Sequence, residues 1–190
     1  MPLFKMFRRK RREREAFALY SAAVTAARQP WLYAELGVPD TLDGRFDLIN
    51  LHMALLVRRL RHEQGPAGAP LAQGVFDAMF LDMDTSLREM GVSDLVVGKR
   101  VRRMWEAFHG RAIAYEAALD AGDAESLALA LARNVWRGEP PGLVEGVAAE
   151  PARRLADHVM NQVGHLAAQP FDALRAGSVD FLSPPEPPRG

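Results

Sequence analysis

Three aspartates set close together are the first residues of this chain that could carry chemistry. Asp77, Asp82 and Asp84 occur in the segment FDAMFLDMD. On a helix, Asp77 and Asp84 share one face with Arg88, whereas Asp82 points elsewhere. A two-carboxylate metal or acid–base site also needs a facing carboxylate or histidine from a second helix. The pattern therefore favours a solvated stripe with an Asp84–Arg88 ion pair, and its functional alternative is the binding of a basic partner.

The other residue types that catalyse reactions or hold metal ions form no recognised motif. The chain has no cysteine and no Gly-x-Ser-x-Gly elbow. Lys99 follows a Gly-x-x-x-x-x-x-Gly spacing and precedes Arg100, whereas a phosphate-binding loop needs four intervening residues and a Ser or Thr. Two histidines, His158 and His165, could share a helical face, but there is no His-x-x-x-His pair. We predict no catalytic residue, no metal site and no cofactor.

Two groups of basic residues are candidates for binding an acidic partner. Helical spacing brings the members of each group together, and the groups are Arg58, Arg59 and Arg61 in one segment and Lys99, Arg100, Arg102 and Arg103 in another. They form either a solvated rim paired with the acidic stripe or one patch that docks an acidic protein or ribosomal RNA. The sequence leaves both interpretations open.

The N-terminal segment gives the clearest physical signal. Residues 1–15 hold seven basic and two acidic side chains, a net charge of +5, interspersed with apolar residues. In such a segment apolar side chains enter the headgroup boundary while cations lie over anionic lipid, at about 1 kcal/mol per basic residue. We predict reversible membrane binding, with a disordered solubilising arm and an RNA-binding arm as alternatives. The predicted membrane-binding residues are Phe4, Lys5, Phe7, Arg8, Arg9, Lys10, Arg11 and Arg12.

Helices must position these groups, because apolar residues recur with helical period and no segment alternates like a strand. The most apolar helix is expected from Phe46 to Leu60, with Asp40 and Asp43 as N-terminal caps, and it should be central and buried. Residues 65–70, rich in Gly and Pro, are expected to form a loop. Further helices are expected over 16–27, 76–90, 94–121, 124–137 and 151–166, with Asp123 and Gly122 as caps.

Length and charge limit the remaining possibilities. A chain of 190 residues suits one domain. Outside the arm the charge is mildly acidic, which argues against a surface that tracks DNA. No run of 18 apolar residues is present, so no membrane span is predicted. We predict an all-α, single-domain multi-helix bundle over 16–175, preceded by a basic amphipathic arm over 1–15. An extended Pro-rich tail over 176–190, ending in SPPEPPRG, is expected not to pack.

Three stretches carry a family resemblance. They are LGVPDTLDGRFDLINLHMALLVRRLR (36–61), FDAMFLDMDTSLREMGVSDLVVGKRVRRMWEAFHGR (76–111), and AYEAAL (114–119) with LARNVWRG (131–138). Their combination of a Leu-His pair followed by basic residues, a Phe-rich helix with Asp82 and a Gly-Lys segment resembles the ubiquinol-cytochrome c chaperone family. The similarity is greater to its bacterial branch than to its mitochondrial branch, and it is less distinctive over 139–190.

The resemblance implies an all-α, non-enzymatic chaperone that aids assembly of the cytochrome bc1 complex. Mitochondrial relatives bind new cytochrome b together with a small partner near the ribosomal exit. Matching residues belong either to the core or to a client surface, and the sequence does not decide which. The expected client- or partner-binding residues are Leu51, His52, Arg58, Arg59, Asp82, Lys99, Arg100 and Arg103, of which Arg103 comes from the basic group.

These observations combine into one functional prediction. The chain is expected to be cytoplasmic and peripheral to the inner membrane, where it binds cytochrome b or another bc1 subunit. An apolar groove lined by Met and Phe would suit a transmembrane client, because these side chains adapt to varied surfaces. The alternative is an RNA- or ribosome-binding adaptor that uses the arm and the basic patch.

Overall fold

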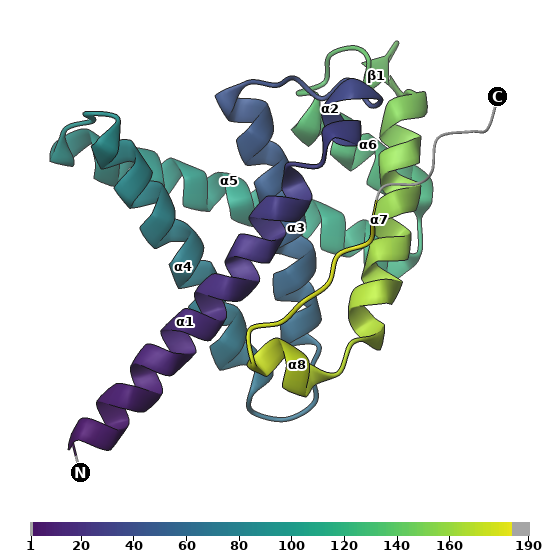
Figure 1. The fold of residues 1–190 in the computed structure, drawn as a ribbon. Helices are drawn as coiled ribbons and strands as arrows, with labels where there is room; N and C mark the ends of the chain where they lie inside the picture. The colour runs from purple at the N-terminus through teal and green to yellow at the C-terminus, as the bar shows by residue number, and fades with distance from the viewer. Residues whose placement is uncertain (1, 184–190) are drawn as a thin grey trace.

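The computed structural model describes residues 2–183, with the side chains of residue 7 and of residues 9–183. Within that range the chain forms eight α-helices and one pair of two-residue strands (Figure 1). The predicted all-α, single-domain fold is therefore confirmed. None of these helices combines the length and the apolar character needed to cross a bilayer.

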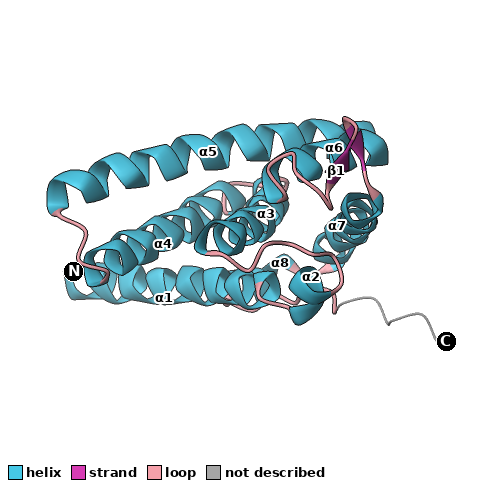
Figure 2. Cartoon of the chain, turned by 90° about the horizontal axis from the view of Figure 1, so that it is seen from above, coloured by secondary structure: helices cyan, strands magenta, loops and turns pink. Residues whose placement is uncertain are grey.

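The central element is α3 (Leu42–Arg61), as the apolar pattern predicted. It packs against α4 (Gly68–Glu89), and the two form a middle layer with α1 (Pro2–Ala27) on one side and α5 (Asp94–Ala121) on the other (Figure 2). Because α3 is covered on several sides, Leu48, Leu51 and Leu56 are completely buried. Truncating one such leucine to alanine typically costs about 2–5 kcal/mol.

The helix ends follow local capping chemistry, with one correction. Asp123 accepts a hydrogen bond from the Ser126 amide at 3.0 Å and begins α6 (Ala124–Val135), as predicted. The predicted caps of α3 were Asp40 and Asp43, but the cap is Thr41, whose Oγ1 accepts from the Gly44 amide at 3.1 Å. Asp43 lies in the first turn, where a carboxylate favours the positive end of the helix dipole.

Several boundaries and small elements were not predicted. Helix α4 begins at Gly68 within the expected loop, because proline is compatible with the first turn of a helix. Helix α7 (Glu150–Ala168) follows the prediction. The short helices α2 (Pro30–Ala34) and α8 (Phe171–Arg175) were missed, as was the antiparallel pair of β1 (Leu143–Val144) and β2 (Val147–Ala148). Elements of two to five residues are too short to show a period.

The basic arm and residues 178–183 are both joined to the folded body, which the sequence did not predict. Helix α1 runs without interruption through residue 15, so the basic arm and the first core helix are one element. Residues 178–183 are extended, and Val179 and Phe181 pack against the core, which corrects the expectation that this part of the tail does not pack. Residues 184–190 lie outside the described residues.

Candidate functional site

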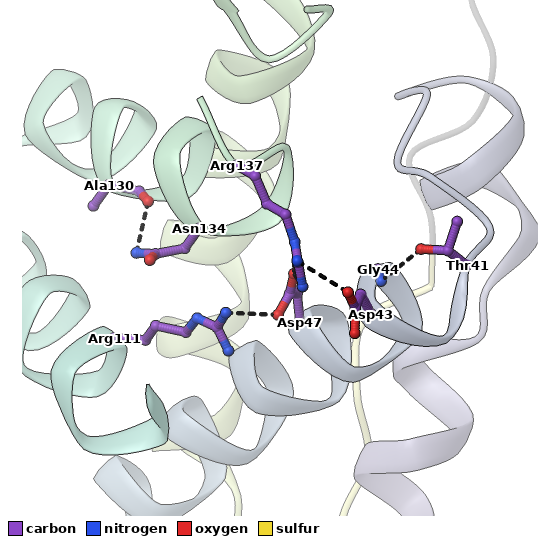
Figure 3. A network of polar contacts seen from close by, with 8 residues as sticks. All are labelled: Thr41, Asp43, Gly44, Asp47, Arg111, Ala130, Asn134 and Arg137. Carbon is purple, nitrogen blue, oxygen red and sulfur yellow. Dashed lines mark hydrogen bonds and ion pairs between the residues drawn. The ribbon is translucent and has the colours of Figure 1, made fainter. Parts of the chain in front are cut away.

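A buried ion network ties three parts of the fold together. Asp47 on α3 is completely buried and lies 2.8 Å from the Nη2 atom of Arg111 on α5. The Nη2 atom of Arg137, which follows α6, lies 3.2 Å from the second carboxylate oxygen of Asp47 (Figure 3). Burial raises the pKa of Asp47, and the two guanidinium groups oppose that shift. The network therefore joins α3, α5 and the turn after α6.

The Arg137 backbone shows that this network is structural. Arg137 has φ of 57°, a left-handed conformation that costs free energy for a residue other than glycine. Its guanidinium pairs with Asp47 and also with Asp43 at 3.0 Å, and these contacts hold the turn in place. The carboxylate is paired with two arginines from other parts of the fold, so the arrangement holds α3, α5 and the turn after α6 in position.

Two residues expected to contact a client belong to the core. Leu51 is completely buried and His52 is 5% exposed. The His52 Nδ1 atom lies 2.9 Å from the Leu48 carbonyl oxygen, and the ring packs against Phe181. Burial lowers the pKa of His52 to about 4. Neither side chain can meet a client on the surface as the chain stands, which excludes both from the exposed candidate surface.

The basic residues at the end of α3 are tied to other helices. Arg58 pairs with Asp120 at 2.7 Å, and Arg61 pairs with Glu116, both on the C-terminal half of α5. Arg59 donates to the Leu166 and Gln169 carbonyl oxygens at the end of α7. These contacts favour the interpretation of Arg58, Arg59 and Arg61 as a paired rim, but their acidic partners lie on α5 and at Glu63 and not in the predicted acidic stripe of α4.

The second basic group is exposed and distant from the first. Lys99, Arg100 and Arg103 lie near the start of α5, and in the part of the chain that the structure describes only Arg102 of this group forms an ion pair, with Glu106. About 15 helical residues separate this group from Glu116, a rise of about 22 Å. The single patch considered from sequence is therefore wrong, because α3 meets the other end of α5.

The aspartates of α4 divide as the helical spacing predicted. Asp84 pairs with Arg88 at 2.6 Å, while Asp82 faces α1 and accepts a hydrogen bond from the Tyr20 hydroxyl at 2.7 Å. Burial and the nearby Asp82 carboxylate raise the pKa of Tyr20. Asp82 thus joins α4 to α1, and this contact accounts for it without a partner.

The described side chains in the N-terminal part of α1 are largely exposed. Phe7 is 62% exposed, and Lys10 and Arg12 are also exposed. Arg9 and Arg11 pair with Glu13 and Glu15 one turn later. The side chains of the other predicted membrane residues, Phe4, Lys5 and Arg8, lie outside the described side chains.

A groove of about 1220 Å³ lies between α1, α4 and α8. Gly74 and Ala16 mark the close crossing of α1 and α4, since a Cβ on Gly74 would lie 3.3 Å from the Ala16 Cβ. The apolar floor of the groove includes this crossing and is formed by Ala16, Phe17, Leu71, Gly74, Ala78 and Leu81. The charged rim is formed by Arg9, Arg11, Arg12, Glu13, Glu15, Asp77, Asp172 and Arg175. We call this the α1–α4 groove.

The lining of the α1–α4 groove differs from the expected one. Its described lining includes Phe17 but no methionine, and Met53, Met79 and Met83 lie in the core. The groove is therefore shaped by small and branched side chains, with alanine and glycine keeping its floor low. An apolar floor within a charged rim is suited to bind one face of an apolar or amphipathic helix.

Among the described residues no three side chains of His, Asp or Glu are placed to hold a metal ion. The chain does contain one Glu-x-x-His spacing, at Glu106 and His109. Glu106 pairs with Arg102, and the His109 Nδ1 atom lies 2.9 Å from the Trp105 carbonyl oxygen. The side chain of Glu106 and the Nδ1 atom of His109 are thus engaged within their own helix.

Comparisons with known proteins give a consistent result. A family model described as "Ubiquinol-cytochrome C chaperone" matches residues 34–181. The ubiquinol-cytochrome-c reductase complex assembly factor 1 of Xenopus laevis is 26% identical over 120 residues, which are 63% of this chain and 59% of that protein. The chain thus spans less than two thirds of that relative. The crystal structure of a Cbp3 homolog from Brucella abortus is similar, with a TM-score of 0.79, 37% identity and coverage of 95% of this chain and 97% of that chain.

Proposed function

The chain belongs to the ubiquinol-cytochrome C chaperone family, and on this premise we propose that it assists assembly of the cytochrome bc1 complex by binding newly made cytochrome b. The family resemblance predicted from the sequence is confirmed by the match over residues 34–181. The observation that carries the proposal is the α1–α4 groove, which offers apolar surface beside a basic helix in a protein of this family.

The shape of the α1–α4 groove supports a helical client. An α-helix with its side chains is about 10–12 Å in diameter, and the groove between α1 and α4 leaves room along its apolar floor. Covering such a floor contributes about 25 cal/mol for each Å² of apolar surface removed from water. The charged rim lets polar flanks of the same client remain solvated.

The N-terminal half of α1 links the groove to a bilayer. Arg9, Arg11 and Arg12 line the groove, and Phe7 and Lys10 lie exposed on the same helix. A helix that lies on anionic lipid would hold the groove where an apolar segment leaves the membrane. On this proposal the chain is cytoplasmic and peripheral to the inner membrane, and its partners are a bc1 subunit and anionic lipid.

A matched pair of substitutions tests the groove. Leu81 and Ile113 are 68% and 67% exposed, but only Leu81 lines the groove. In cells that lack the native gene, Leu81→Glu should weaken capture of cytochrome b about 30-fold, because burial of a leucine contributes about 2 kcal/mol. Ile113→Glu should behave like the native chain. The measurements are crosslinking to cytochrome b, identified by mass spectrometry, and the amount of assembled bc1 complex.

Three outcomes would contradict the proposal. Normal amounts of bc1 complex and haem-loaded cytochrome b after deletion of the gene would exclude the assembly role. Equal effects of the two substitutions would exclude the groove as the client site. Salt-sensitive co-sedimentation with ribosomes, without any crosslink to cytochrome b, would replace the proposal by the RNA- or ribosome-binding alternative.

A further inference from the structure

The segment after α8 lies on the body as a bound extended peptide would. We call residues 178–183 the strap. It follows Gly177 and runs from α8 back along α7, in the space between α1 and α7 (Figure 1). Val179 and Phe181 point inward and pack against the core, whereas Asp180 between them is exposed. This alternation is that of an extended chain on a surface.

The body holds the strap chiefly through its backbone. The Gln169 side chain makes a two-point contact with Asp180, in which Oε1 accepts from the Asp180 amide at 2.9 Å and Nε2 donates to the Asp180 carbonyl oxygen at 2.7 Å. The Gln162 Oε1 atom accepts from the Leu182 amide at 2.8 Å. Backbone groups are common to all sequences, so these contacts recognise an extended chain. Side chains add selectivity: the Asp180 carboxylate lies 2.9 Å from the His165 Nε2 atom, and Val179 and Phe181 pack against the core.

The side-chain amide of Gln162 makes only one of the hydrogen bonds that it could make to the strap. Its side chain is 1% exposed, and its Nε2 atom has no hydrogen-bond partner among the described residues. A buried amide donor without a partner costs about 1–3 kcal/mol. Gln169 satisfies both of its amide atoms on one strap residue, whereas Gln162 satisfies one. The strap is therefore an incomplete occupant of the surface that holds it.

Two residues singled out from the sequence lie under or beside the strap. The His52 ring centroid is 5.7 Å from that of Phe181, and removal of Phe181 would uncover His52. Arg59 donates to the Gln169 carbonyl oxygen at 3.0 Å and so positions Gln169. The surface under the strap thus includes the aromatic ring of His52. Gln169, which binds the strap, is held in place by Arg59 of α3.

We propose that the surface formed by His52, Gln162 and Gln169 is a binding site for an extended segment of a partner polypeptide. That segment carries an apolar residue and, two positions later, an aromatic residue, and it offers a backbone carbonyl to Gln162 Nε2. The strap occupies the site within its own chain and must be displaced. The site is separate from the α1–α4 groove and does not rest on the proposed function.

Because the strap is part of the same chain, a partner must bind with high affinity to displace it. A short tether gives the strap an effective concentration in the millimolar range, so a free peptide with the same contacts competes poorly. Weakening the strap raises the fraction of open sites, and the apparent affinity for a free peptide rises in proportion. This relation permits a test with the full chain.

The test uses a fluorescent peptide with the sequence of residues 177–183, GSVDFLS, and fluorescence anisotropy. The full chain with Phe181→Ala should bind this peptide at least tenfold more tightly than the native chain. The control Ser178→Ala, an exposed strap residue, should match the native chain. A peptide with alanine at its phenylalanine should not bind, and adding Gln162→Leu to Phe181→Ala should reduce binding.

Four results would overturn the proposal, the last of them in the case that the variant does not fold. Phe181→Ala that folds like the native chain yet binds the peptide no better would do so, as would equal binding of the alanine peptide. Dimerisation of the native chain that Phe181→Ala abolishes would assign the site to the strap of a second copy. If Phe181→Ala does not fold, hydrogen exchange of the native chain decides: excess peptide should deprotect the Asp180 and Leu182 amides while α7 stays protected, and unchanged exchange would exclude the site.

Discussion

The two halves of α5 carry similar side chains in different surroundings. In the C-terminal half, Phe108 and Tyr115 are buried, and Arg111, Glu116 and Asp120 each pair with a residue of α3. In the N-terminal half, the basic residues 99, 100 and 103 are exposed, and Leu95 is largely exposed as well. Figure 1 shows this half projecting with the end of α4 away from the body.

The difference shows that the composition of a helix does not reveal whether a charged side chain stabilises the fold or is free to bind a partner. An arginine that faces α3 is part of the fold, because its partner is buried and its removal leaves a charge without compensation. An arginine in the projecting half has water as its main neighbour, and exposed charges contribute little to stability. Residues that bind a partner are therefore expected among the exposed arginines and not among the paired ones.

The strongest way to break this comparison is to remove one arginine from each half. Arg111→Ala should lower the free energy of unfolding by about 3–5 kcal/mol, because Asp47 stays buried with only Arg137 as its partner. Arg103→Ala should change it by no more than about 0.5 kcal/mol. Urea unfolding followed by circular dichroism measures both. Equal effects would show that the paired half is not more tightly integrated than the free half.

A second prediction concerns the buried side of α3, where burial lowers the pKa of His52 to about 4. The unfolded chain takes up a proton near pH 6.5 and the folded chain does so only near pH 4. The free energy of unfolding should therefore fall as pH drops through this window, by about 3 kcal/mol from this group, and lose nothing more from it below pH 4. At pH 7 the contribution is fully present.

The comparison of His52→Gln with the native chain isolates that contribution. The substitution should flatten the pH dependence of unfolding between about pH 6.5 and pH 4, whereas His62→Gln, at an exposed histidine, should leave it unchanged. Thermal unfolding across a pH series gives the slopes. A native slope that survives in His52→Gln would show that other groups carry the acid sensitivity.

The smallest expected effect sharpens the contrast between the free half of α5 and the N-terminal half of α1. Lys10→Gln with Arg12→Gln should weaken binding to anionic liposomes about 30-fold, since two basic residues contribute about 2 kcal/mol. Arg100→Gln with Arg103→Gln should change it less than about twofold. Flotation across a salt series measures both affinities. If the α5 pair has the larger effect, the projecting half of α5 is the lipid contact instead.

Capping and periodicity explain why most helices were predictable. Asp123 begins α6, and Gly122 ends α5 with φ of 63°, because both depend on atoms within a few residues. The predicted cap of α3 was wrong because three neighbouring residues, Asp40, Thr41 and Asp43, are all of types that cap helices well. Only the backbone conformation selects Thr41.

The packing of the strap, in contrast, could not be predicted from the local sequence. Its composition predicts an unpacked tail, yet Phe181 packs on His52 and the Gln162 amide takes the Leu182 N–H. These contacts join residues 20 to 129 positions apart in the chain, so no local pattern announces them. The α1–α4 groove was likewise out of reach, because its floor depends on the crossing of two helices.

By itself the sequence determined the helical class, the approximate extent of α3, α5, α6 and α7, and the family, since each follows from local spacing or from motifs read along the chain. Only the tertiary structure decided that Leu51 and His52 are core, that Arg58, Arg59 and Arg61 are paired, and that the projecting cations are exposed. The reason is physical: helical periodicity is set by neighbouring residues, whereas burial and ion pairing are set by whichever distant segment packs alongside.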